Sequence, residues 1–123
     1  MSKQVNNVII WQFPLKTVSE ANRRDHWSKS AQRHRMQKFV VQQALKCEIR
    51  AVKLPCCIKL TRISQRMLDF DNLVSSQKYI LDAICDLIIP GLKPGRADSD
   101  PRISVSYHQE KGKMQQLRIE IDF

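Results

Sequence analysis

The chain has 123 residues, of which 42% are hydrophobic and 27% charged, a composition ordinary for a single globular domain spanning residues 1–123. No apolar run reaches the roughly 18 residues of a membrane-spanning helix, and the first residues lack the layout of a signal peptide. We therefore expect neither a membrane segment nor secretion. The net charge of +9 favours a polyanionic partner.

The first half of the chain predicts one strand and one long helix. Residues 8–13 are rich in β-branched and aromatic side chains and are closed by Pro14, which is typical of a strand. Residues 15–24 predict a loop. Apolar residues then recur near helical spacing over residues 25–52, and Pro55 disfavours continuation of this helix.

The second half predicts a strand over residues 56–63 and a helix over residues 72–89, which ends at Pro90-Gly91. Residues 103–108 and 117–123 alternate between apolar and polar side chains, so they predict a C-terminal antiparallel hairpin with its turn at Gly112. The order β-α-β-α-β-β predicts a small α/β domain with a mixed sheet. Neither a GxGxxG fingerprint nor a P-loop is present, so we expect no nucleotide cofactor.

Two pairs of carboxylates stand out. Asp69 and Asp71 lie where the chain enters the second predicted helix. A purely structural interpretation makes Asp71 the N-cap of this helix, but it gives Asp69 no role. Asp98 and Asp100 precede the third predicted strand, where they can equally be turn formers beside Pro101. A hard cation gives both pairs one explanation, because Mg²⁺ binds one or two carboxylates together with water and phosphate oxygens. Acids in a basic chain therefore suggest metal-assisted phosphodiester hydrolysis.

A lysine on the second predicted helix fits this chemistry. A helical spacing of about 100° per residue places four side chains on one stripe, namely Asp71, Ser75, Lys78 and Asp82. The opposite, core-facing side carries Leu73, Ile80, Ile84 and Leu87. Lys78 in this position can hold a phosphate or neutralise transition-state charge. The plain alternative is a solvated lysine paired with Asp82 at i+4.

These features occur in a fixed order: Asp69-x-Asp71-Asn72-Leu73, then Lys78-x-x-x-Asp82-Ala83, then an acid just before the third predicted strand. Over residues 68–108 this pattern resembles the RusA-type Holliday-junction resolvases. The segments Pro14-Leu-Lys-Thr17 and His26-Trp27 are also similar to the N-terminal part of phage and prophage members. Where the family often has adjacent acids, Ser99 separates Asp98 from Asp100.

The resemblance implies a RusA-like fold and a Mg²⁺-dependent endonuclease that acts as a homodimer and cuts four-way DNA junctions symmetrically. Mn²⁺ is a possible substitute for Mg²⁺. Carried over residue by residue, Asp69 and Asp71 would be metal ligands and catalytic residues. Asp100 would be the third carboxylate, with Asp98 as the alternative, and Lys78 would match the catalytic lysine.

The basic residues are concentrated in the N-terminal part of the chain. Residues 1–50 carry 10 bases and 3 acids, whereas residues 51–123 carry 11 bases and 9 acids. We expect five of these bases to hold the backbone phosphates of branched DNA, namely Arg23, Arg24, Lys29, Arg33 and Arg35. A solvated helix face is the plain alternative.

Two other functions remain open. One is a non-catalytic DNA-binding protein that keeps the fold and uses the acids as caps and turns; the other is a nuclease acting on flaps or forks. The four cysteines follow neither disulfide-framework nor zinc-site spacing, so we expect reduced thiols and a cytoplasmic protein. The family resemblance implies that the cell is bacterial or phage-infected.

Overall fold

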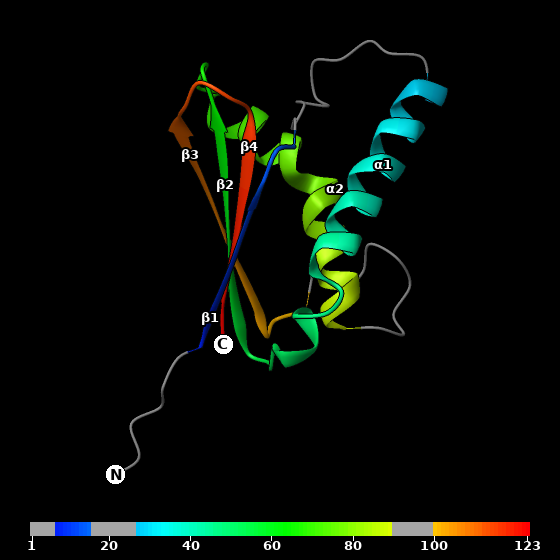
Figure 1. Ribbon diagram of the computed structural model, residues 1–123, viewed down its shortest axis with the longest axis vertical. Coiled ribbons are helices and arrows are strands. Elements are labelled where there is room, and N and C mark those ends of the chain that lie inside the picture. Colours follow the sequence, from blue (N-terminus) through cyan, green and yellow to red (C-terminus); the bar gives the residue numbers. More distant parts are fainter. Residues whose placement is uncertain (1–6, 16–26, 90–99) are drawn as a thin grey trace.

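The computed structural model describes residues 7–15, 27–89 and 100–123, and it consists of a four-stranded mixed sheet with two helices on one face (Figure 1). The elements in chain order are β1 (Val8–Phe13), α1 (Trp27–Leu45), the short 3-10 helix η1 (Ile49–Ala51), β2 (Cys56–Ser64), α2 (Phe70–Ile88), β3 (Ile103–Lys111) and β4 (Gln116–Asp122). The expected small α/β domain with a mixed sheet is confirmed.

The first helix is shorter than the sequence predicts. It ends at Leu45, and the chain continues through a turn into η1, whose Ile49 is buried. Ile49 is apolar because its side chain is buried in the core, and it therefore extends the apolar pattern of α1 beyond the end of the helix. Periodicity therefore predicted one unbroken helix where the chain changes from an α-helix to a 3-10 turn.

The predicted C-terminal hairpin is wrong. The strand order is β1-β4-β2-β3, so β2 lies between the last two strands. β4 pairs antiparallel with both β1 and β2, whereas β3 pairs in parallel with β2. Alternation along residues 103–108 and 117–123 identifies two half-buried strands, but it does not identify their neighbours. The central position goes to β2, which has the most continuously buried sequence of the four strands.

The core lies between the sheet and the two helices. Ile58 and Leu60 of β2 and Ile119 of β4 face Ile80 and Ile84 of α2, and all five side chains are fully buried. Helix α1 closes the layer through Val41 and Leu45 and packs against α2, where His34 and Tyr79 stack with ring centroids 3.5 Å apart. No helix within the described residues is long and apolar enough to cross a bilayer.

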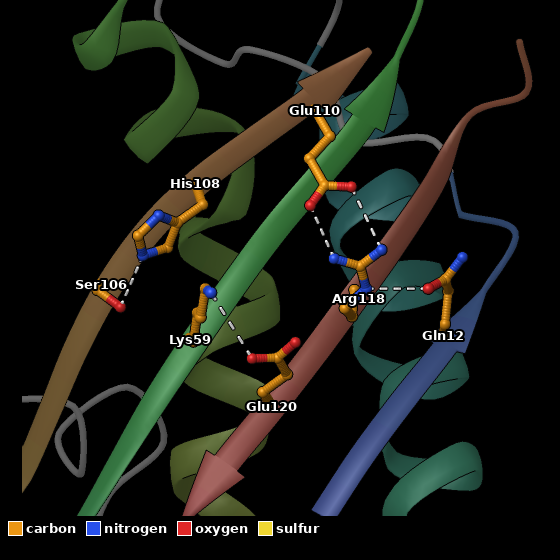
Figure 2. Close-up of polar contacts among 7 residues, drawn as sticks. All are labelled: Gln12, Lys59, Ser106, His108, Glu110, Arg118 and Glu120. Atoms are coloured by element: carbon orange, nitrogen blue, oxygen red, sulfur yellow. Dashed lines mark hydrogen bonds and ion pairs between the residues drawn. The ribbon is translucent and has the colours of Figure 1, made fainter. Parts of the chain in front are cut away.

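The other face of the sheet carries polar side chains, as Figure 2 shows. Arg118 of β4 donates to both carboxylate oxygens of Glu110 across β2, at 2.9 and 3.3 Å, and to Gln12 of β1 at 3.0 Å. Lys59 and Glu120 form an ion pair at 3.8 Å. Because successive strand residues alternate between faces, the same strands that build the core also present this charged surface.

The connection from β3 to β4 passes the end of β2 at Gly112. The Gly112 amide donates to the Ser64 carbonyl oxygen at 3.1 Å. A β-carbon at Gly112 would lie 2.6 Å from the Cγ2 atom of Ile63, a side chain that is itself buried. Glycine is therefore required here by close approach to β2, and not by a hairpin turn.

We expect Gly112→Ala to lower the free energy of unfolding by about 1–3 kcal/mol, because the added methyl group overlaps a buried, β-branched side chain that cannot swing away. Urea denaturation followed by circular dichroism measures this change. The control is Met114→Ala in the same connection, where the native side chain is 68% exposed. Equal stability of the Gly112→Ala and Met114→Ala proteins would contradict the predicted contact.

Candidate active site

Helix α2 begins at Asp69, which serves as its N-cap. The Asp69 backbone is extended, its Oδ1 atom accepts from the Asn72 amide at 2.9 Å, and its Oδ2 atom accepts from Asn72 Nδ2 at 3.0 Å. The prediction that Asp71 is the N-cap is wrong, because the helix starts two residues earlier than its apolar periodicity indicates. Asp71 lies in the first turn and is exposed, with no hydrogen bond or ion pair to the described residues.

The segment that carries these two acids is held against β3. The Leu68 amide donates to Gln109 Oε1 at 2.9 Å, and Gln109 Nε2 donates to the Leu68 carbonyl at 2.7 Å. Phe70 meets Tyr107 edge to face, with ring centroids 6.4 Å apart, yet 66% of Phe70 remains exposed. The start of α2 therefore has a fixed position over the second half of β3 and presents an exposed aromatic ring beside the two carboxylates.

Lys78 is exposed on the same side of α2 as Asp71, about 10 Å further along the helix axis. The predicted solvent stripe is wrong at its fourth member, because Asp82 is buried. Lys78 itself is exposed, and its Nζ atom lies 5.9 Å from the centroid of the Tyr79 ring. The ammonium group of Lys78 stays available to an external anion.

Asp100 is engaged by Arg102. Its Oδ1 atom accepts from the Arg102 amide at 2.9 Å and from Arg102 Nε at 3.0 Å, and its Oδ2 atom accepts from Arg102 Nη2 at 2.8 Å. The side-chain hydrogen bonds from Arg102, followed by the backbone one, lower the pKa of Asp100 to about 2. The Asp100 carbonyl also accepts from the Ile103 amide, so this residue shapes the turn that leads into β3.

The structure separates Asp100 from Asp69 and Asp71. β2 and β3 are parallel; Asp69 follows the end of β2, whereas Asp100 precedes the start of β3. The six residue steps from Ile103 to Gln109 span about 20 Å of extended strand. Figure 1 shows the start of α2 and the start of β3 at opposite ends of the sheet.

Among the described residues, a single chain therefore does not bring Asp100 together with Asp69 and Asp71. No group of three or more acidic, histidine or cysteine side chains lies in a metal-binding arrangement among the described residues. Asp98, the alternative third ligand, lies outside the described residues.

Part of the expected DNA-binding surface lies on α1, which packs beside α2. Lys29 and Arg35 are exposed in its first half, and Arg33 is half-buried. α1 and α2 pack side by side, and both begin at the upper end of the molecule in Figure 1. Arg23 and Arg24 lie outside the described residues.

A polar cavity of about 400 Å³, which the sequence did not predict, lies near the end of β2. Its lining combines three cations with three neutral polar residues, namely Arg62, Arg66, Lys113, Ser64, Gln65 and Gln115. The available signal was Arg62, a charged residue at an inward position of an alternating strand. The opposite side of the cavity is formed by Lys113 and Gln115, about 50 residues later in the chain, which the parallel pairing of β2 with β3 brings close.

Comparison of the sequence with protein-family models gives no match, and comparison with curated proteins gives none either. The family resemblance therefore rests on the motif residues alone.

We expect Asp69→Ala to lower the free energy of unfolding by about 1 kcal/mol, because the first turn of α2 loses its side-chain cap. Asp69→Asn should cost much less, since asparagine caps helices equally well. Urea denaturation of both variants and of Asp71→Ala measures the difference. If Asp71→Ala lowered the free energy of unfolding more than Asp69→Ala does, Asp71 and not Asp69 would be the N-cap.

We expect the Asp100 carboxylate to titrate with a pKa near 2, and replacement of its partner in Arg102→Gln to raise that pKa. Since folding lowers the pKa from an ordinary value of 3.8, the pair stabilises the fold fully above about pH 4, and this contribution is lost as the pH falls towards 2. The pKa of Asp100 is measured by following its carboxyl carbon chemical shift by NMR over this pH range. Lys111→Gln, which removes an exposed charge from the far end of β3, should leave the Asp100 titration unchanged.

Proposed function

We propose that this chain is a Mg²⁺-dependent endonuclease that cuts branched DNA, with four-way junctions as its substrate. The observation that carries the proposal is the exposed pair Asp69 and Asp71 at the start of α2, three residues beyond a cavity lined by cations. In a chain with a net charge of +9, an acid pair within a DNA-facing surface opposes binding unless a metal ion intervenes.

The two carboxylates fit a magnesium ion. Asp71 offers both of its oxygens to a ligand, and each oxygen of Asp69 accepts only one hydrogen bond, from Asn72, which leaves acceptor capacity on both. Mg²⁺ usually binds proteins through one or two carboxylates and keeps waters and phosphate oxygens as its other ligands; Mn²⁺ accepts the same oxygen ligands. When bound, the metal would activate water and stabilise the leaving oxygen.

The chain's own groups would orient the substrate. The first-turn amides of α2 favour a phosphate at the same point as the acid pair. Lys78 supplies a positive charge on the same side of the helix, where it would oppose the charge that develops on the phosphate. Phe70, exposed beside the acids, is suited to stack on a base that is unpaired at a junction.

The same proposal includes a second copy of the chain. A four-way junction has two-fold symmetry, and symmetric cleavage at two strands needs two sites related by a two-fold axis. Lys29 and Arg35 would then bind the backbone of the junction arms without reading sequence. The RusA-type resolvases, which the motif residues resemble, are expected to work in this way.

A non-catalytic DNA-binding protein is the second candidate. The observations that favour it are local: Asp69 is used as a helix cap, and Asp100 is bound by Arg102. In this reading the acids build turns, and the cationic surface alone meets DNA. A flap or fork nuclease is distinguished by substrate, since it would cut flaps faster than junctions at equal salt.

We expect the purified protein to cut a synthetic four-way junction at symmetric positions in Mg²⁺ and not in EDTA. Asp71→Asn should reduce cleavage at least a hundredfold while leaving junction binding intact, because one metal ligand is lost and a repulsive charge is removed. Asp122→Asn, an exposed acid at the far end of β4, is the matched control and should retain cleavage. Tight binding without cleavage in Mg²⁺ or Mn²⁺ would establish the second candidate.

Asp100→Asn, in the same cleavage assay, tests whether the active site lies within one chain. Because Asp100 precedes β3 at the opposite end of the sheet from the acid pair, we expect this variant to retain cleavage. A loss as large as that of Asp71→Asn would contradict this expectation and would require a second chain to supply Asp100.

A further inference from the structure

Arg62 is a buried cation that lacks an anionic partner among the described residues. Only 7% of it is exposed, on the helix-facing side of β2. Its Nη1 atom donates to the Arg66 carbonyl at 2.6 Å, and its remaining donors have no hydrogen-bond partner within the described residues. Burial lowers the pKa of the guanidinium, but arginine remains protonated at neutral pH. Buried charges in proteins are normally paired, so this one needs an explanation.

The surroundings of Arg62 add positive charge. The cavity beside it is lined by Arg66 and Lys113 and contains no acidic side chain in its lining. Gln65 Nε2 donates to the Lys113 carbonyl at 3.1 Å, which ties the two sides of the cavity together. Three cations around one polar cavity repel one another in the absence of an anion. An arginine fork with further N–H and ammonium donors matches the tetrahedral oxygens of a phosphate.

The cavity lies close to the acid pair. Arg66 precedes Asp69 by three residues, so their Cα atoms are at most about 11 Å apart. Phosphates recur along one DNA strand at every nucleotide, with a rise of about 3.4 Å. One strand can therefore reach both places with phosphates a few nucleotides apart.

We propose that this cavity binds a backbone phosphate of the DNA strand to be cut and so positions a neighbouring phosphate at Asp69 and Asp71. Arg62 forms the floor of the phosphate site, while Arg66 and Lys113 close it from two sides. This inference deepens the proposed function and rests on it for the identity of the ligand.

The first test uses inorganic phosphate and measures amide and arginine Nε–H NMR shifts at constant ionic strength, with chloride as the reference. We expect saturable shifts at residues 62–66 and 113–115, together with a higher melting temperature in phosphate. Both effects should be lost in the double variant Arg66→Gln/Lys113→Gln. They should persist in Lys46→Gln/Lys53→Gln, which removes the same charge from exposed positions near the other end of the sheet. Equal responses of the two double variants would overturn the site.

Arg62→Met separates a ligand-binding role from a structural one. Replacing a buried, unpaired charge with an apolar side chain of similar length should leave the melting temperature in chloride unchanged or raise it. The same variant should lose the stabilisation by phosphate. A lower melting temperature in chloride together with retained phosphate binding would make Arg62 a structural residue and overturn the proposal. The double variant tests the site independently, because its two substitutions involve side chains closer to the surface.

The second test uses DNA and the Asp71→Asn protein, so that binding is measured without cleavage. Arg66→Gln/Lys113→Gln should weaken junction binding about tenfold more than Lys46→Gln/Lys53→Gln does. It should also reduce the slope of log K against log salt by about one, as expected for the loss of one phosphate contact. Identical affinities and slopes for the two double variants would refute the DNA-phosphate site.

The two tests distinguish failure of this inference from failure of the proposed function. If the wild-type protein cuts no DNA but the cavity variants lose phosphate and junction binding, the nuclease proposal fails and the phosphate site stands. If the protein cuts junctions and the cavity variants behave like their charge-matched control, the phosphate site fails and the nuclease proposal stands.

Discussion

The position of β2 between β3 and β4 is the constraint on which the rest of the structure depends. A central strand must satisfy its backbone on both sides and bury its inward side chains, and β2 does so through Ile58 and Leu60. Because β3 runs parallel to it, the chain must return along the whole sheet before β3 begins, and α2 makes that return. The start of α2 is thereby fixed at one end of the sheet, and the start of β3 at the other.

This arrangement gathers opposite charges at one end of the molecule. Asp69 and Asp71 open α2, while Arg66 and Lys113 stand at the end of β2 and in the connection after β3. Cations gathered around one cavity repel one another, and an exposed acid pair opposes the approach of a phosphate unless a metal ion intervenes. Both repulsions are relieved when a phosphate and a divalent cation arrive together, and the proposed nuclease function needs that pairing.

Local hydrogen bonding already uses two of the acids that the motif marks. Asp69 caps a helix through Asn72, which orients its carboxylate and leaves acceptor capacity on both oxygens. Asp100 is bound more completely, through three hydrogen bonds from Arg102, and its lowered pKa reflects that binding. Within one chain, the hydrogen bonds from Asn72 still allow Asp69 to bind a metal ion, whereas those from Arg102 favour a role for Asp100 in the turn before β3.

The sequence by itself determined the two helices, the four strands, the small α/β class and the acid pair at the start of α2, because these follow from side-chain periodicity and from residues a few positions apart. Only the tertiary structure decided that β2 separates β3 from β4, that Asp100 lies far from Asp69, and that Arg62 meets Lys113 around one cavity. Strand pairing joins segments about 50 residues apart, and it is governed by which strand buries most surface. Alternation within a single strand carries no record of its neighbours.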